Sequence, residues 1–294
     1  MENRSGALLL IGNGFDKSIN LPTGYSDFLE SEEFYTAYKA TIKESPTSGL
    51  FTHLKEKQNL ENWVDVECEL KKFALEKSQE SINSYYSSVL RKDYKLLKAS
   101  LKNYLQRISA DVKVGVDNPV YSFLKTVAKQ SFSVISFNYT NTFERVINQL
   151  GLSLKQNFSI HNLHGSIEED NLIFGISEVE SERNEFISEE ITFLQKSYCV
   201  NYNPTRFTQA LGGTAQIYFY GVSLGESDSD YFKNYFKRLV FDNQRVEFCF
   251  SFFEETGLQH LHNRLRVYTG NDVYGFKSTH SVTYFDCVNG KFLS

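Results

Sequence analysis

The feature that most constrains the fold is a short apolar run that leads directly into a glycine loop. Residues Ala7 to Ile11 are all apolar, and Gly12-Asn13-Gly14-Phe15-Asp16 follows without a break. A short apolar run bounded by glycine is typical of a strand buried in a parallel sheet. Glycines let such a loop bring backbone N–H groups close to an anion. We therefore expect a nucleotide-type ligand where this first strand ends.

The long interval before the next strand excludes the usual dinucleotide-binding dehydrogenase. Such an enzyme returns to a second strand soon after its glycine loop and ends that strand with an acidic residue. Here roughly a hundred residues of helical pattern intervene. Its clearest part runs from Ile82 to Ile108, where apolar residues recur at steps of three and four. This periodicity predicts a long amphipathic helix, and the interval predicts a helical insertion.

Strand-like segments resume after the insertion and alternate with helical patterns. The expected strands are Phe132 to Phe137, Asn157 to Leu163, Asn171 to Ile176, Ala215 to Tyr220, Val246 to Phe250 and Ser281 to Phe285. The expected helices between them include Asn141 to Leu150, Asp228 to Leu239 and Glu254 to Arg266. Alternation of this kind favours an α/β fold with a mostly parallel sheet and helices on both faces. We expect residues 1–24 and 110–294 to form this Rossmann-like core, and residues 25–109 an all-helical insertion.

Composition limits the classes of partner. The 294 residues carry a net charge of −5, which disfavours a protein that binds nucleic acid over its whole surface but leaves a local basic groove open. The four cysteines show no C-x-x-C spacing, which excludes a zinc ribbon and a thioredoxin-type motif. Neither a signal peptide nor an apolar stretch of membrane-spanning length is evident. We expect a cytoplasmic protein without a membrane partner or a metal.

Polar clusters follow four of the expected strands. They are the loop from Gly12 to Asp16, Asn138-Tyr139-Thr140-Asn141, His164-Gly165-Ser166, and Gly221-Val222-Ser223-Leu224-Gly225 continuing to Asp228. The carboxyl ends of parallel strands meet at one edge of a sheet, where ligands bind. Each cluster alone also fits turns, helix caps or a buried histidine. Together they predict one site.

These motifs resemble the abortive-infection AbiH family of bacterial antiphage proteins. The resemblance also rests on Leu21-Pro22-Thr23-Gly24-Tyr25-Ser26-Asp27-Phe28 and Asn62-Trp63-Val64-Asp65-Val66-Glu67, and it spans about Leu8 to Phe236. The chain departs from the family at Val222, where the family commonly has His. The resemblance implies a bacterial, cytoplasmic abortive-infection effector, with a phage-derived trigger or a homo-oligomer as possible partners.

The order of motifs is also similar to that of the sirtuin-like NAD-binding fold. This similarity implies that Asn138 and His164 are the catalytic pair. It implies that Gly12, Asn13, Gly14 and Phe15 line the dinucleotide phosphates, with Asp16, Ser223 and Asp228 also among the cofactor-binding residues. Two departures are Asn13 in the middle of the glycine loop and the absence of the sirtuin zinc cysteines.

Cleavage of an N-glycosidic bond suits these residue types. Its transition state resembles an oxocarbenium ion, and nicotinamide leaves readily, so a strong acid is not required. Histidine can take a proton near neutral pH. An amide such as Asn138 can hold a water and a ribose hydroxyl together, because it both donates and accepts hydrogen bonds. We therefore expect hydrolysis of NAD or a related nucleotide, with NAD as substrate or ligand.

Other functions remain open at this point. Gly221 to Gly225 fits the G-x-S-x-G of a serine hydrolase, with Ser223 as nucleophile and Asp272 and His280 as partners. A nucleotide sensor would need the glycine loop but not His164. His161 and His164 fit a metal site poorly, because their spacing suits a helix and the segment reads as extended. Asp65 and Glu67 are acids that a nuclease could use.

Overall fold

The computed structural model describes residues 5–44, 49–57, 66–152, 159–177, 186–225, 228–242 and 244–293. The chain divides into two compact units. The sheet unit comprises Met1–Leu21, Asp111–Ser166 and Asn203–Ser294, and the helical unit comprises Pro22–Ala110 and Ile167–Tyr202. The segment Ile167–Tyr202, which the sequence analysis placed within the α/β core, thus has its contacts in the helical unit.

The sheet unit is built on a mostly parallel sheet. Its seven described strands lie in the order β3-β2-β1-β4-β5-β6-β7. They are β1 (Ala7–Ile11), β2 (Phe132–Ser136), β3 (Ile160–Asn162), β4 (Gln216–Tyr220), β5 (Glu247–Phe252), β6 (Ser281–Asp286) and β7 (Lys291–Leu293). All neighbouring pairs are parallel except β6 and β7. This confirms the expected α/β class, and β7 is an antiparallel edge strand that the sequence did not indicate.

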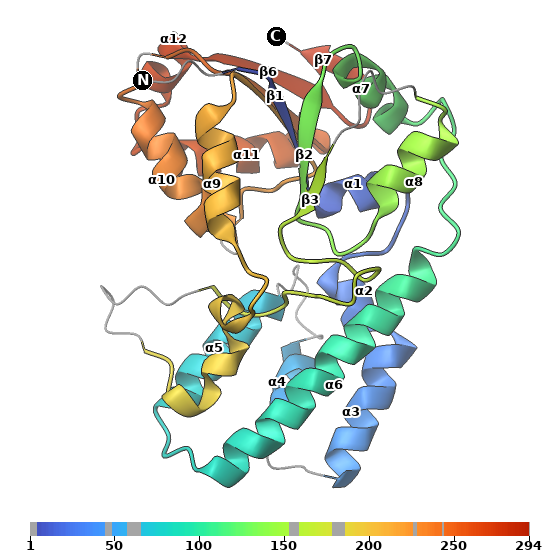
Figure 1. The fold of residues 1–294 in the computed structure, drawn as a ribbon, viewed down its shortest axis with the longest axis vertical. Helices are drawn as coiled ribbons and strands as arrows, with labels where there is room; N and C mark the ends of the chain where they lie inside the picture. Colours follow the sequence, from blue (N-terminus) through green and yellow to red (C-terminus); the bar gives the residue numbers. More distant parts are fainter. Residues whose placement is uncertain are drawn as a thin grey trace. The chain divides into compact units, whose positions relative to one another are not determined.

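Helices cover both faces of this sheet, as Figure 1 shows. On one face, Leu9 and Ile11 of β1 pack in a buried cluster with Phe15, Phe123 and Phe143. These three aromatic residues belong to α1 (Asn13–Ser18), α7 (Pro119–Val127) and α8 (Thr142–Gln149). Alternate residues of β1 are buried on both faces, because a central parallel strand is covered on each side.

Aromatic side chains fill the other face. Phe219 of β4 stacks on Phe250 of β5 with ring centroids 4.6 Å apart. Phe232 and Phe236 of α10 (Ser229–Leu239) lie against Phe219, with centroids 5.7 Å and 6.3 Å away. The remaining helices of this unit are α9 (Pro204–Gly213), α11 (Glu254–Tyr268) and α12 (Val273–Thr279).

The helical unit contains the segment inserted after β1, as expected. Its α-helices are α2 (Tyr25–Leu29), α3 (Glu32–Glu44), α4 (Leu50–Lys57), α5 (Val66–Ser78) and α6 (Ser84–Ile108). Asn83 caps α6, since its side chain accepts a hydrogen bond from the N–H of Tyr86 at 2.8 Å. The apolar stripe of α6 is buried, and its opposite face carries lysines. Two 3₁₀ helices, η2 (Glu189–Leu194) and η3 (Lys196–Tyr198), complete this unit's described elements.

The expected strand from Asn171 to Ile176 is wrong. Side chains of α6, rather than a neighbouring strand, satisfy its backbone: Lys98 Nζ donates to the carbonyl of Leu172 at 2.7 Å, and the Tyr94 hydroxyl donates to the carbonyl of Phe174. Ile176 makes an isolated bridge with Gln195. The apolar residues of this segment are buried in the helical unit. The apolar pattern therefore correctly indicated burial, but the segment is not a strand.

Across the described ranges, no helix has the length and apolar character needed to cross a membrane.

Candidate functional site

The candidate site begins where four neighbouring parallel strands end. Strands β3, β2, β1 and β4 lie side by side, and backbone hydrogen bonds continue one step beyond their ends. Gly12 N donates to Tyr220 O at 3.0 Å, Phe137 N donates to Ile11 O at 2.8 Å, and Leu163 N donates to Ser136 O at 2.8 Å. The loops that carry the four polar clusters therefore leave the sheet from one edge.

The two loop glycines are required by a close approach between the loop after β1 and the loop after β4. Gly14 N donates to Gly221 O at 3.0 Å. A Cβ at Gly12 would lie 2.5 Å from Gly221 O, and a Cβ at Gly14 would lie 2.6 Å from Gly221 Cα. No side chain fits at such distances, and Gly221 itself has a positive φ of 69°. Packing between the two loops therefore explains these glycines.

The hydrogen bonds within this loop limit how its backbone N–H groups can bind an anion. The N–H groups of Gly12 and Gly14 donate to Tyr220 O and Gly221 O, and that of Phe15 donates to Gly12 O at 2.9 Å. These three donors are already used within the protein. The predicted phosphate contacts would therefore need a rearrangement of the loop or other donors.

Asp16 lies at the centre of a buried polar cluster. Its side chain is 1% exposed and accepts hydrogen bonds from Thr140 Oγ1 at 2.7 Å and from Thr142 Oγ1. The two threonine hydroxyls are 3.2 Å apart. Burial raises the pKa of Asp16 to about 6, while the hydroxyls of Thr142 and Thr140 and the Asn138 amide partly oppose this rise. Asp16, which lies in α1, therefore joins the segment after β1 to the segment after β2.

Asn138 follows β2 and lies beside this cluster. Its side chain is 7% exposed, and its backbone N–H donates to Ser136 Oγ at 3.1 Å. Although the Asn138 amide is near the Asp16 carboxyl, its Nδ2 is buried and has no partner in hydrogen-bond geometry among the described residues. A buried amide N–H that lacks a partner costs free energy, so native structures rarely leave one unsatisfied. Asn138 therefore has a donor that a water or a ligand can use.

His164 follows β3 and lies in an aromatic setting. It is 5% exposed, and its Nε2 is 3.3 Å from the hydroxyl of Tyr231 in α10. The rings of Phe137 and Tyr139, which flank Asn138 in the chain, have centroids 5.7 Å and 6.1 Å from that of His164. The two residues predicted to be catalytic therefore share a neighbourhood at this edge, and their catalytic roles stay predictions.

The remaining predicted ligand contacts lie in different environments. Phe15 is fully buried, with its ring between those of Phe143 and Tyr220, so it belongs to the core. Asn13 is the first residue of α1 and is half-buried. Ser223 is exposed, and its Oγ accepts a hydrogen bond from Gly225 N at 3.2 Å. Asp228 is half-buried at the N-cap of α10.

Comparison with known proteins gives one match. A family model described as "Bacteriophage abortive infection AbiH" matches residues 8–250, which run from β1 into β5 and include the helical insertion and all four loops of the candidate site. The chain belongs to the AbiH family. No curated protein and no solved structure matches it significantly, so the expected likeness to the sirtuin-like fold stays a prediction. Val222, where AbiH proteins were expected to have His, is buried with 7% of its surface exposed.

The structure of this AbiH protein does not bring together Ser223, Asp272 and His280, the residues of the alternative serine hydrolase triad. His280 precedes β6, whereas Ser223 follows β4, and the parallel strands between them separate the two edges by roughly 15–20 Å. Both ring nitrogens of His280 contact backbone: Val246 N donates to Nδ1 at 3.2 Å, and Nε2 is 2.9 Å from Leu239 O. Asp272 caps α12 by accepting a hydrogen bond from Gly275 N at 2.8 Å.

Of the acidic residues considered for a nuclease, Glu67 lies in the part of the chain that the structure describes. Trp63 and Asp65 lie outside the described residues. Glu67 is buried in the helical unit, where its Oε2 is 2.7 Å from Nζ of Lys196, a side chain with 0% exposure. Glu67 Oε1 also accepts a hydrogen bond from Gly175 N at 3.4 Å. Glu67 therefore ties α5 to the segment Ile167–Tyr202.

Metal binding has no support in the described parts of the chain. There, no three His, Cys, Asp or Glu side chains are grouped so that they could hold a metal ion. His161, on β3, has a buried Nε2 without a hydrogen-bond partner among the described residues. Burial and the charge of Arg206 lower the pKa of His161, so its neutral form is favoured.

The cluster made by Asp16, Thr140 and Thr142 was not expected from the sequence. A signal was present, because two threonines spaced by two residues follow the same strand as Asn138. Pairing them with Asp16, more than a hundred residues earlier in the chain, required the strand order.

Proposed function

We propose that this AbiH protein acts in abortive infection by hydrolysing the N-glycosidic bond of NAD or a related nucleotide at the strand ends of its sheet unit. The observation that carries the proposal is the buried Asn138 Nδ2, which lacks a hydrogen-bond partner among the described residues. Asn138 follows β2, a parallel strand inside the sheet, and lies at the edge where open α/β sheets bind their ligands. The neighbouring His164 supplies a group able to take a proton.

The reaction needs a held water, an oriented ribose and a proton acceptor. Asn138 donates through Nδ2 to a ribose hydroxyl or to the attacking water and accepts through its carbonyl oxygen. The water oxygen bonds to the anomeric carbon while the C–N bond breaks. The electron pair of that bond moves to the pyridinium nitrogen, and neutral nicotinamide leaves. His164 takes the proton that the water loses, and Tyr231 orients the imidazole ring.

The Asp16 cluster supports this chemistry by fixing Asn138. Asp16 is too buried to contact a ligand while Thr140 and Thr142 cover it. We assign Asp16 as a positioning residue that holds the loop from Asn138 to Thr142. This assignment replaces the direct contact with ligand that the sequence suggested.

A screen of nucleotides tests the proposal. The purified full chain is incubated with NAD, NADP, ATP, GTP and ADP-ribose, and the products are read by mass spectrometry. We expect release of a free base, such as nicotinamide, from at least one of them. Saturable binding without any product would instead favour a nucleotide sensor that does not catalyse a reaction.

A further inference from the structure

Cations are concentrated along one stripe of α6 in the helical unit. Residues three or four apart on a helix share a face. Such steps connect Ser84, Ser87, Arg91, Lys95, Lys98 and Lys102. The chain as a whole has a net charge of −5, so this stripe runs against the overall charge. A local concentration of positive charge on a protein of net negative charge is typical of a surface that binds an anionic partner.

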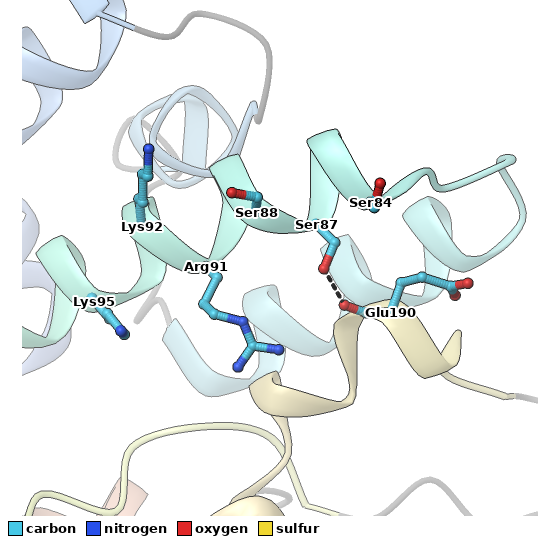
Figure 2. A pocket seen from close by; sticks show the side chains of 7 residues that line it. All are labelled: Ser84, Ser87, Ser88, Arg91, Lys92, Lys95 and Glu190. Carbon is cyan, nitrogen blue, oxygen red and sulfur yellow. Dashed lines mark hydrogen bonds between the residues drawn. The ribbon is translucent and has the colours of Figure 1, made fainter.

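Two hollows lie along this stripe. The first has a volume of about 490 Å³, and its lining includes Arg91, Lys92 and Lys95. Figure 2 shows Ser87 and Arg91 pointing toward the segment that carries Glu190, and Ser87 Oγ donates to the Glu190 carbonyl at 2.6 Å. The second, of about 520 Å³, also has Lys95 in its lining. Lys95 lines both, so the two hollows adjoin at this residue, and we refer to them together as the α6 groove.

Most of the charge in this groove is not neutralised by carboxylates. Lys102 pairs with Asp170 at 2.6 Å, and Lys98 Nζ donates to a backbone carbonyl. Arg91 lies over the ring of Phe193, 4.1 Å from its centroid. Among the described residues, Lys92 and Lys95 form no ion pair, and both are exposed. Like charges three and four residues apart destabilise a helix, so a bound anion would relieve this repulsion.

We propose that this groove, the α6 groove, binds the backbone of a single-stranded nucleic acid. From Arg91 to Lys102 the helix rises about 16 Å, a length along which a nucleic-acid strand places several phosphates. A mononucleotide has too few phosphates to contact all the cations from Arg91 to Lys102. A single strand can follow the run of two hollows along α6, and its unstacked bases are free to reach neighbouring rings.

Two exposed aromatic residues are next in the chain to residues that line the hollows. Tyr85 is 69% exposed and follows Ser84, which lines the first hollow. Tyr198 is 59% exposed and precedes Cys199, which lines the second. Bases of a single strand stack on such rings while the phosphates meet cations, and this combination tolerates any sequence. The residues that line the α6 groove all belong to the helical unit and include none of the residues of the candidate site.

Fluorescence polarisation with a labelled oligodeoxythymidine of about fifteen nucleotides tests the proposal on the full chain. We expect saturable binding whose dissociation constant rises about 20-fold between 50 and 200 mM salt, the change for about three phosphate contacts on a single strand. Lys95→Glu and Lys92→Glu should each weaken binding at least about fivefold and reduce the salt dependence. Lys237→Glu, the same charge change at an exposed position of α10, should leave the dissociation constant within about twofold.

Three outcomes would overturn the proposal. The first is binding that does not saturate or does not depend on salt. The second is an equal loss of affinity in Lys95→Glu and Lys237→Glu, which would indicate attraction by net charge alone. The third is a duplex of the same length, or inorganic polyphosphate, that binds as tightly as the single strand, since this would remove the role of unstacked bases.

Discussion

The Asp16 carboxylate accepts a hydrogen bond from Thr140 Oγ1 at 2.7 Å. This bond joins the segments after two strands that are neighbours in the sheet but lie more than a hundred residues apart in the chain. It also places a carboxyl group with a raised pKa beside Asn138, which the proposed reaction uses.

The titration of Asp16 should make the protein more stable at lower pH. Its pKa is raised from 3.8 to about 6 in the folded state, so the folded state binds this proton more tightly than the unfolded chain. Its contribution is therefore present in full below pH 3.8 and is lost as pH rises through about 6. Relative to Asp16→Asn, the parent protein should gain about 1 kcal/mol in unfolding free energy between pH 7 and pH 5. Urea denaturation at both pH values measures this gain.

Asp286→Asn is the matched control for this titration. The pKa of Asp286 is lowered, chiefly by a hydrogen bond from the Asn289 side chain, so its contribution is lost only as pH falls toward more acidic values. It should therefore show the same change between pH 7 and pH 5 as the parent. An identical pH dependence in Asp16→Asn and the parent would contradict the burial of an ionisable Asp16.

Gly14→Ala should destabilise the sheet unit, because its Cβ would lie 2.6 Å from Gly221 Cα. We expect a loss of about 2 kcal/mol or more in unfolding free energy, as for other overpacked sites. Gly257→Ala in α11 is the control, since a Cβ there meets nothing within 4 Å and alanine favours the helix. Chemical denaturation in which both variants are as stable as the parent would show that the loops do not pack as described.

The buried pair of Lys196 and Glu67 should behave as a unit. Lys196→Met leaves the Glu67 carboxylate buried without its cation and should cost about 3–5 kcal/mol in unfolding free energy. Adding Glu67→Gln should recover part of this loss, because the buried charge is then gone. A double-mutant cycle measures the coupling, and strictly additive losses would mean that the two side chains do not interact.

Much of the fold could be predicted from periodicity alone. The apolar run from Ala7 to Ile11, the strand-like segments that became β2, β4, β5 and β6, and the stripe of α6 are local signals. The failure at Asn171 to Ile176 has a clear cause. Apolar residues such as Phe174 are buried against helices rather than strands, and Tyr94 and Lys98, which bond the backbone there, lie far earlier in the chain.

The position of the candidate site in the fold could be predicted from the sequence, but the contacts between its residues could not. Strand ends indicated Asn138 and His164, because parallel topology brings such positions to one edge. The sequence suggested that the loop glycines serve an anion, whereas the structure shows Gly12 and Gly14 packed on Gly221. A close approach between loops that are distant in sequence leaves no local pattern, so only the three-dimensional structure could reveal it.

Ser223 should not act as a nucleophile. A histidine partner for it was expected at His280, whose ring nitrogens both contact backbone at the other edge of the sheet. We expect no covalent labelling of the folded protein by a fluorophosphonate probe, since an unactivated serine hydroxyl is a weak nucleophile. Intact-mass spectrometry checks this, with Ser223→Ala as the reference. Stoichiometric labelling of the parent that is absent in Ser223→Ala would instead support a serine hydrolase function.

The most direct test of the account is the turnover of NAD, or of whichever nucleotide the screen identifies, by the parent and by Asn138→Ala and His164→Ala. We predict that each variant lowers kcat by about 10²-fold or more, because each removes positioning or proton transfer in the transition state. Ser223→Ala should keep kcat near that of the parent, since Ser223 is exposed and bonds only its own loop. Folded Asn138→Ala and His164→Ala proteins with unchanged kcat would contradict the central claim.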